Sequence, residues 1–369
     1  MRKTILILTT ILLTSLLGCS NKTEVEFSSD CWASQENGID YVRYVGEYFD
    51  TEIKISICSD NESNKDIFDD VEAIINKYHQ LSDKRNSYDG LINVYTINNN
   101  PEIELEITNE LYELLILSKE AYNLSDKLFN IALDPVIKEW NKSYEGFINN
   151  ELNTRPDIDS LNQLQNFIDL DNLIITETTV IIKPGMSIDL GAMSKGFMVQ
   201  KVNEYLSEKT RIRGFIIDAG GNISVGGNHP SSKRDYFTVG IEDPIKNDFE
   251  NYCVTDCNYK IVKLTGGQTI VTSGDYQRYF RYTDEYGNEF KYHHIIDPLT
   301  LFPKISKVKS VSVITDNSAY ADLYSTIVFL NDFEAAKEFV ESTDDLEAIW
   351  YLEDQSIQTS SNFNNYILE

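Results

Sequence analysis

The sequence predicts an α+β fold that contains antiparallel sheet. Stretches with the alternating pattern of β-strands and stretches with the period of amphipathic helices are mixed along the whole chain. Between residues 215 and 271, short strand-like stretches are separated by glycine-rich turns, which is typical of antiparallel sheets. The chain shows no internal repeat of roughly 20–50 residues, so a solenoid or propeller is not expected.

The expected elements follow from local patterns. Ile67, Val71, Ile75 and Tyr78 share one helical face, and Thr108 is a typical residue for the start of a helix. In chain order we expect strand 48–57, helix 64–81, helix 108–124, a long polar connection 142–160, helix 157–168, strand 174–182, a turn and helix 189–207, short strands 215–271, strand 308–314 and helices near 318–341.

The N-terminus has the pattern of an export signal that ends in a lipidation site. Arg2 and Lys3 precede a short apolar run over residues 5–17, and Leu16-Leu17-Gly18-Cys19 is typical of a lipoprotein signal. We therefore expect a signal peptide 1–18, a diacylated thiol on Cys19, a polar tether 19–40 and a location on the extracytoplasmic face of the cell membrane. The alternative is an ordinary cleaved signal peptide that happens to end near a cysteine.

Charge and cysteine content limit the partners. The 369-residue chain has a net charge of −27, so nucleic acid and anionic lipid surfaces are not expected to bind it. Any anionic ligand needs a cation or a local basic pocket. Besides Cys19 the chain has four cysteines, Cys31, Cys58, Cys253 and Cys257. They could form disulfides, with three possible connectivities, or remain free thiols. A metal site at Cys253 and Cys257 is the least favoured alternative.

Five short blocks rich in Gly, Asp, Ser and Thr are the candidates for chemistry, because the usual nucleotide-loop, zincin and hydrolase motifs are absent from the sequence. The first block, 187–196, contains Asp189 and Lys195 where a strand passes into a helix, a place suited to phosphate. The second, 216–223, has paired glycines after an apolar strand. The alternative for the first block is a plain turn with an exposed lysine, and the alternative for the second is a tight hairpin.

The remaining three blocks lie in the C-terminal half. Block 271–280 places hydroxyls and a glycine before an aromatic strand, which simple core packing would also explain. In block 293–300, His294 near an Asp-Pro turn suits a general base, although a lone histidine is often structural. In block 318–326, Asp322 and Thr326 share a helical face beside Ser325, which suits Mg²⁺; the alternative is an Asp that favours a helix N-terminus.

In this order and spacing, the five blocks closely resemble the FAD:protein FMN transferase (ApbE) family, over roughly residues 41 to 350. Weaker upstream stretches at 86–98 and 129–140 belong to the same resemblance. The resemblance implies a T-fold-like arrangement of mixed sheets flanked by helices, with the catalytic domain over 41–369 and the active site in a cleft between two lobes.

The resemblance also implies an activity and a set of site residues. Members transfer FMN from FAD to a Thr or Ser hydroxyl of a target protein, here an exported one, and release AMP with the help of Mg²⁺. By similarity, Mg²⁺ is held by the Ala192 carbonyl, Asp322, Ser325 and Thr326, and the candidate base is His294. The expected contacts with FAD are Tyr88, Phe129, Asn130, Asp189, Lys195 and Ile295.

The sequence departs from the family pattern at three places. Leu301 stands where members usually carry Gly, Phe49-Asp50-Thr51 stands for Met-Gly-Thr, and Phe129-Asn130 stands for Phe-Asp. The departures at 49–51 and 129–130 affect expected contacts with flavin or adenine. None of the three departures removes an expected metal ligand. Two alternatives to transfer remain, an Mg²⁺-dependent FAD pyrophosphatase that yields FMN and AMP, and a lipoprotein that binds FAD without chemistry.

Overall fold

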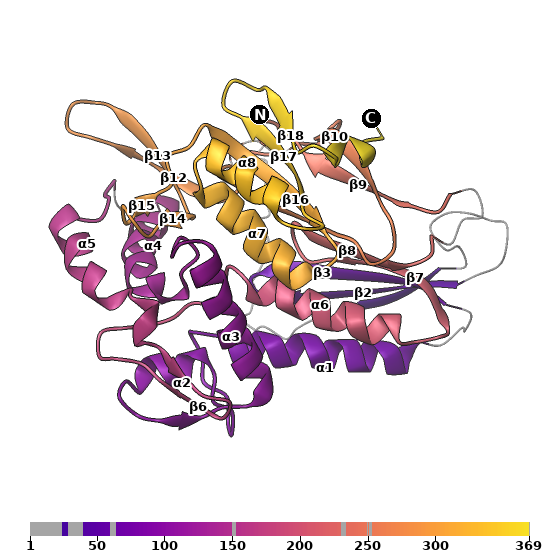
Figure 1. Ribbon diagram of the computed structural model, residues 1–369, viewed down its shortest axis with the longest axis horizontal. Helices are drawn as coiled ribbons and strands as arrows, with labels where there is room; N and C mark the ends of the chain where they lie inside the picture. Colours follow the sequence, from indigo (N-terminus) through magenta and orange to yellow (C-terminus); the bar gives the residue numbers. More distant parts are fainter. Residues whose placement is uncertain are drawn as a thin grey trace, which may run out of the picture.

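A nine-stranded antiparallel sheet forms the centre of the molecule, as the computed structural model shows (Figure 1). The strand order is β1-β2-β3-β7-β8-β11-β16-β17-β18, so a hairpin from the start of the chain pairs with strands from its middle. The strands are β1 (Glu24–Ser28), β2 (Asp40–Tyr48), β3 (Thr51–Ser59), β7 (Ile212–Asp218), β8 (Asn222–Gly227), β11 (Thr269–Gly274), β16 (Val308–Thr315), β17 (Glu347–Leu352) and β18 (Ile357–Thr359).

Four helices cover one face of this sheet (Figure 1). They are α1 (Lys65–Ser82), α6 (Ser194–Ser207), α7 (Ser318–Leu330) and α8 (Phe333–Ser342). The apolar side of α1 packs into the largest core cluster together with inward-facing strand residues such as Ile55 and Ile217. On the opposite face, β9 (Phe237–Glu242) and β10 (Asn258–Leu264) pair and pack over a separate cluster around Phe237 and Phe363.

The remaining elements lie beside the helical layer, at the lower and left side of Figure 1. The helices are α2 (Val94–Asn99), α3 (Asn109–Leu124), α4 (Asp134–Ile148) and α5 (Ile158–Leu164). The strands form three small sheets: β4 (Leu105–Glu106), β5 (Ile174–Ile175) and β6 (Thr179–Ile181); β12 (Tyr279–Thr283) and β13 (Glu289–His293); β14 (Ile296–Asp297) and β15 (Phe302–Pro303). Trp140, Phe280 and Ile296 join α4 to the β12–β13 hairpin in one apolar cluster.

The structure describes residues 24–28, 40–59, 64–149, 153–229, 234–248, 250 and 253–368. The expected signal peptide 1–18, Cys19 and Cys31 lie outside these residues. Part of the expected tether is described, and there Glu24–Ser28 forms β1 and pairs with β2, so this stretch departs from the expectation. Across the described part of the chain, no helix combines the length and the apolar composition that crossing a membrane requires.

Most of the expected elements are present, and the α+β class is confirmed. Helices 64–81, 108–124 and 157–168 correspond to α1, α3 and α5, and the side chain of Thr108 accepts a hydrogen bond from the backbone of Leu111 as the N-cap of α3. Cys253 and Cys257 form a disulfide, and Cys58 is disulfide-bonded as well, which decides between the alternatives for these three.

Three expectations were wrong in detail. Strand 48–57 is interrupted, because Phe49 and Asp50 form the two-residue turn between β2 and β3 with φ of 55° and 56°. The polar connection expected at 142–160 begins later, since α4 continues to Ile148. Strand 174–182 is a small hairpin of β5 and β6 rather than one strand.

The backbone shows why glycine is usual at two of the positions where the sequence departs from the family pattern. Leu301 has a φ of 60° and Asp50 a φ of 56°, both in the left-handed region that glycine adopts most easily. Leu301 is nevertheless buried in the α4 cluster, and its carbonyl accepts a hydrogen bond from Trp140 Nε1 at 2.8 Å. Burial of its side chain offsets the conformational strain.

Candidate functional site

Lys195 lies at the point where three of the sequence blocks meet. It is in the first turn of α6, and its Nζ donates a hydrogen bond to the carbonyl of Gly220 at 2.8 Å. Gly220 has a φ of 60°, and a Cβ there would lie 2.2 Å from Thr51 Oγ1. Glycine is therefore required for the β7–β8 turn to lie against the start of β3, which brings Thr51 to the site.

Asp322 is held against the first turn of α6 by a close approach of two helices. The backbone N–H of Gly196 donates to Asp322 Oδ2 at 2.8 Å. A Cβ on Gly196 would lie 2.4 Å from Asp322 Cβ and 2.5 Å from the Ser318 carbonyl, so only glycine fits. Burial raises the pKa of Asp322, and the charge of Lys195 and the Gly196 N–H oppose that shift only in part.

Oxygen atoms gather around Asp322 as a hard cation requires. The hydroxyls of Ser325 and Thr326 both donate to the Asp322 carbonyl, at 3.0 and 3.3 Å, which leaves their lone pairs available. Ser273 Oγ on β11 donates to Ser325 Oγ at 2.9 Å. Thus block 271–280 also reaches this site.

Two further oxygen atoms are available there, Asp322 Oδ1 and the carbonyl oxygen of Ala192. Within the described residues Asp322 Oδ1 takes part in no hydrogen bond. The Gly196 N–H, which could otherwise bond to the carbonyl of Ala192 four residues earlier, is taken by Asp322. All of these donors are oxygen atoms, which suit Mg²⁺ better than a transition metal. In the part of the chain that the structure describes, no group of three or more His, Cys, Asp or Glu side chains gathers that could hold a metal ion.

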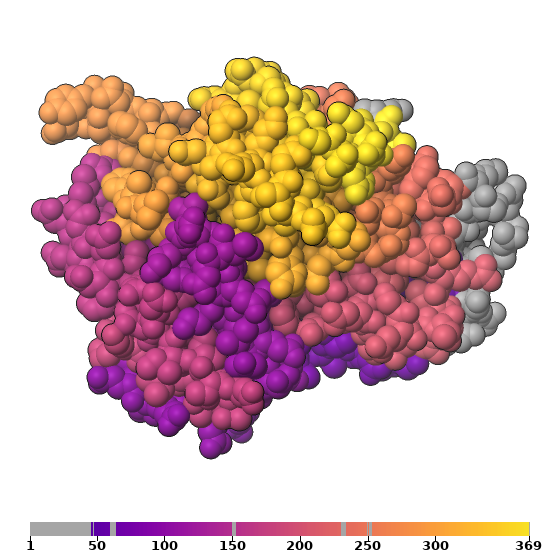
Figure 2. Space-filling view, in the orientation of Figure 1, coloured from indigo at the N-terminus to yellow at the C-terminus, as the bar shows by residue number. Residues whose placement is uncertain are grey.

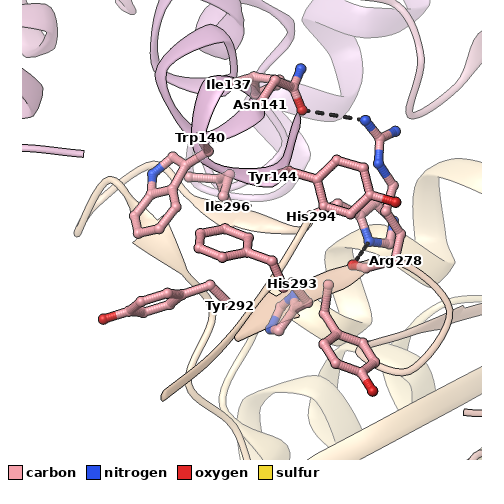
Figure 3. A pocket seen from close by; sticks show the side chains of 11 residues that line it. Ile137, Trp140, Asn141, Tyr144, Arg278, Tyr292, His293, His294 and Ile296 are labelled. Carbon is pink, nitrogen blue, oxygen red and sulfur yellow. Dashed lines mark hydrogen bonds between the residues drawn. The ribbon is translucent and has the colours of Figure 1, made fainter. Parts of the chain in front are cut away.

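His294 is fixed in one tautomer. Its Nδ1 lies 3.2 Å from the carbonyl of Arg278, so Nδ1 must carry the proton and donate it, which leaves Nε2 unprotonated (Figure 3). Burial, followed by His293 and the cations Arg278 and Lys195, lowers the pKa of His294 to about 3. The residue keeps exposed surface, and water there moderates this shift, but its direction makes the ring neutral at neutral pH.

The neighbouring His293 has a different role. It is buried, its Nε2 lies 2.9 Å from the Lys304 carbonyl, and its Nδ1 accepts the backbone N–H of Ile295 at 3.2 Å. Both ring nitrogens are therefore used within the protein, and burial lowers the pKa of His293. Of this pair, His294 is the one whose Nε2 is available for chemistry.

Asp189 belongs to a network of charges that the sequence did not reveal. Its Oδ1 accepts the backbone N–H of Gly191 at 2.8 Å, and its Oδ2 lies 2.6 Å from Lys84 Nζ. The same Lys84 ammonium lies 2.6 Å from Asp134, which is fully buried and also accepts from Ser187 and Lys138. Lys84 is 50 residues from Asp134 and 105 from Asp189, so no local pattern could indicate it.

The other expected FAD contacts are distributed over the fold. The hydroxyl of Tyr88 donates to Asp83 at 2.8 Å, and Ile295 is half-buried beside the α7–β16 core. Phe129 is 1% exposed, and the side chain of Asn130 caps a short helical turn and bonds to the Ile168 carbonyl. The side chain of Phe129 thus belongs to the core, and the side-chain amide of Asn130 is bonded within the protein.

A pocket opens beside His294, between α4 and the β12–β13 hairpin (Figure 3). Trp140 and Tyr292 lie on one side, and Tyr144, Arg278 and His294 lie on the other. None of the residues around Asp322 or Lys195 lines this pocket.

Comparisons with known proteins point to one family. The chain is 28% identical over 259 residues to the FAD:protein FMN transferase of Klebsiella pneumoniae (strain 342), covering 69% of this chain and 73% of that protein. It is 26% identical over 337 residues to the protein of the same name from Haemophilus influenzae, covering 89% and 86%.

Two crystal structures share the fold. The ApbE protein of Thermotoga maritima superposes with a TM-score of 0.74 at 23% identity, covering 89% of this chain and 100% of that one. The flavin transferase ApbE of Vibrio cholerae superposes with a TM-score of 0.72 at 18% identity, covering 89% and 99%. The model of the ApbE family matches residues 49–350, most of the chain. With its ordered blocks assembled around Lys195, the chain belongs to the ApbE family.

Proposed function

We propose that this chain is an FAD:protein FMN transferase that attaches FMN to a Thr or Ser hydroxyl of an exported protein and releases AMP. Family membership and the names of the relatives support this activity. The observation that carries it is the place of Lys195 in the first turn of α6, beside the Gly196 N–H that donates to Asp322. A cation and a candidate metal ligand therefore lie together, and the unprotonated Nε2 of His294 can act as the base.

The transfer step uses His294 as the base. Its unprotonated Nε2 accepts the proton of the acceptor hydroxyl, whose oxygen forms a bond to the phosphorus of the FMN half of FAD. The bond from that phosphorus to the bridging oxygen breaks, and AMP leaves with the electron pair. The proton then passes from His294 to solvent. FAD would lie in a cleft between the lobes, with Asp189, Tyr88, Ile295 and Lys195 around it.

Mg²⁺ fits the oxygen set around Asp322. Asp322, Ser325, Thr326 and the Ala192 carbonyl would hold it, because their free oxygens match its preference for hard ligands. When bound, Mg²⁺ neutralises charge on the pyrophosphate and stabilises the leaving group. The chain has a net charge of −27, so Lys195 and this ion together are needed to hold an anionic substrate.

We also propose that a lipid on Cys19 holds the enzyme at the outer face of the cell membrane. The support is the sequence pattern Leu16-Leu17-Gly18-Cys19 after an apolar run. Such an anchor would keep the catalyst beside exported electron-transfer proteins. Cys19→Ala should move the protein from the membrane fraction to the soluble fraction and abolish labelling by radioactive palmitate; an unchanged membrane fraction would remove this proposal.

Incubation of residues 19–369, which keep β1 and β2, with FAD, Mg²⁺ and a candidate exported acceptor tests the activity. A covalent gain of one FMN on the acceptor, together with AMP, supports transfer. AMP and free FMN without modification of the acceptor would show a pyrophosphatase instead. Unchanged FAD that remains bound would show a flavin-binding protein without chemistry.

A further inference from the structure

The pocket beside His294 has a lining that suits a peptide side chain. Trp140, Tyr144 and Tyr292 present aromatic surface, and Trp140 and Tyr292 pack with ring centroids 4.9 Å apart. The space of about 290 Å³ at this place includes open solvent, so the pocket is shallow. It cannot enclose a dinucleotide such as FAD, but its half-buried aromatic rings offer a surface against which one apolar side chain can pack.

Arg278 gives the mouth of this pocket a positive charge. Its guanidinium lies over the ring of Tyr144 at 5.3 Å and donates to Asn141 Oδ1 at 3.3 Å, and it is exposed. Within the described residues Arg278 forms no ion pair with a carboxylate, although the chain has 59 Asp and Glu. By contrast Arg281, three residues later in β12, is paired with both Glu250 and Glu289.

The position of the pocket decides what should occupy it. His294 lies in its wall, whereas Asp322, Ser325, Lys195 and Asp189 do not line it. A molecule in the pocket would thus reach the base from a side that none of these four residues lines. The acceptor is the substrate that must bring a hydroxyl to His294 from outside the FAD site.

We propose that this pocket is the acceptor subsite, in which an apolar side chain of the acceptor segment packs against its aromatic lining beside Tyr144 and a neighbouring carboxylate binds Arg278. The inference rests on the proposed transfer activity and names how that activity selects its protein substrate. A carboxylate and a guanidinium form strong paired hydrogen bonds, and Arg278 is oriented for them by Asn141 and Tyr144. Selection therefore combines one apolar contact with one charge.

The test uses three synthetic peptides that contain Leu and Thr and differ only in a Glu, Gln or Lys next to the Thr. FMN on the peptide reports transfer, and quenching of FAD fluorescence reports FAD affinity. The wild type should modify the Glu peptide about tenfold more efficiently than the Gln peptide, the lower end of the effect of a hydrogen bond to a charged group. The Lys peptide should be the poorest substrate.

Variants then separate the subsite from the FAD site. Arg278→Gln and Tyr144→Ala should raise the KM for the Glu peptide about tenfold while FAD affinity stays within about twofold. Arg278→Glu should prefer the Lys peptide. Arg281→Gln is the matched control, because it removes the same charge three residues away at a position that does not line the pocket, and it should leave peptide selection unchanged.

Two results would overturn the inference. Loss of FAD affinity in Arg278→Gln would show that Arg278 binds the pyrophosphate and not a peptide carboxylate. Equal transfer to all three peptides by wild type and variants would show that the pocket selects nothing. If the wild type released AMP but modified neither the peptides nor the exported acceptor, the proposed transfer itself would fail, and the subsite with it.

Discussion

Asp322 is a carboxylate that the fold holds in an unfavourable environment. Burial raises its pKa, so the ionised form is less stable in the folded protein than in water. Asp322→Asn should keep the hydrogen bond from Gly196 and remove the buried charge. We expect transfer to fall at least about 100-fold, the effect of removing a group that stabilises a transition state.

The same variant should raise the thermal midpoint of the protein without Mg²⁺, because the buried charge is gone. Thermal unfolding with and without Mg²⁺ checks this without an activity assay. Mg²⁺ should stabilise the wild type and not Asp322→Asn. Stabilisation of both proteins by the same amount would contradict the assignment of Asp322 as a metal ligand.

His294 should act as a base over a wide pH range. Since its pKa is lowered below the ordinary value of 6.5, the ring stays unprotonated when the pH falls through that value. The pH profile of kcat for transfer should therefore show no protonation step near that ordinary value. His294→Gln should slow transfer about 10²–10⁴-fold and leave FAD affinity unchanged. A step near pH 6.5 that disappears in the variant would show that the pKa is not lowered.

Lys84 should be a positioning residue for Asp189. Burial alone would lower the pKa of Lys84, but the charges of Asp189 and Asp134 outweigh it and raise the pKa, so the lysine remains charged. Lys84→Met leaves the buried Asp134 with Lys138 alone, and we expect a loss of about 3 kcal/mol in the free energy of unfolding. Lys138→Met is the control, because Lys138 is exposed, and it should cost at most about 1 kcal/mol.

Urea unfolding measures the stability of both Lys84 and Lys138 variants, and titration with FAD measures whether Asp189 is still in place. Lys84→Met should also weaken FAD binding, whereas Lys84→Arg should restore part of it. Equal stability of Lys84→Met and the wild type would show that the network contributes nothing.

The packing of α6 against α7 brings the residues of the candidate site together. It depends on Gly196, because a Cβ would meet Asp322 Cβ at 2.4 Å and the Ser318 carbonyl at 2.5 Å. Gly196→Ala should force the helices apart, lower stability by about 1–3 kcal/mol as overpacking does, and displace Asp322. Mg²⁺ affinity should therefore fall together with stability.

Glu204→Ala is the matched control on the exposed side of α6, and it should change neither property by much. Calorimetric titration with Mg²⁺ and thermal unfolding of both variants provide the measurement. A stable Gly196→Ala protein with unchanged Mg²⁺ affinity would show that the close approach of the helices is not needed.

Local signals explain which elements the sequence predicted well. Helix α3 was expected because Thr108 is a good N-cap and an apolar period follows it, and α1 because its buried face repeats over its whole length. The turn at Phe49-Asp50 was missed because phenylalanine rarely adopts a positive φ, and pairing with β7 overrides that preference.

The sequence predicted only part of the candidate site, because the site is formed by blocks that lie far apart in the chain. The order of the blocks identified Asp322, Lys195 and His294, but it did not indicate that Lys195 lies within electrostatic range of both others. Lys84 and Arg278 were missed because their roles depend on partners brought close only by folding.

At the scale of the whole molecule, the central sheet supports two sets of elements that meet near His294. The helical layer supplies Lys195 and Asp322, and α4 with the β12–β13 hairpin supplies the aromatic pocket (Figure 2 shows these regions in contact on one face). Two cations, Lys195 and Arg278, lie at the two ends of the proposed reaction path, where a chain of net charge −27 needs them to hold anionic groups.

Intact mass measurement of an exported acceptor protein tests the central claim most directly. The acceptor is incubated with FAD, Mg²⁺ and either the wild type, His294→Gln or Asp322→Asn. The account predicts a gain of one FMN less one water with the wild type, with an equal amount of AMP, and almost no gain with either variant. An unmodified acceptor alongside complete conversion of FAD to FMN and AMP by the wild type would contradict it.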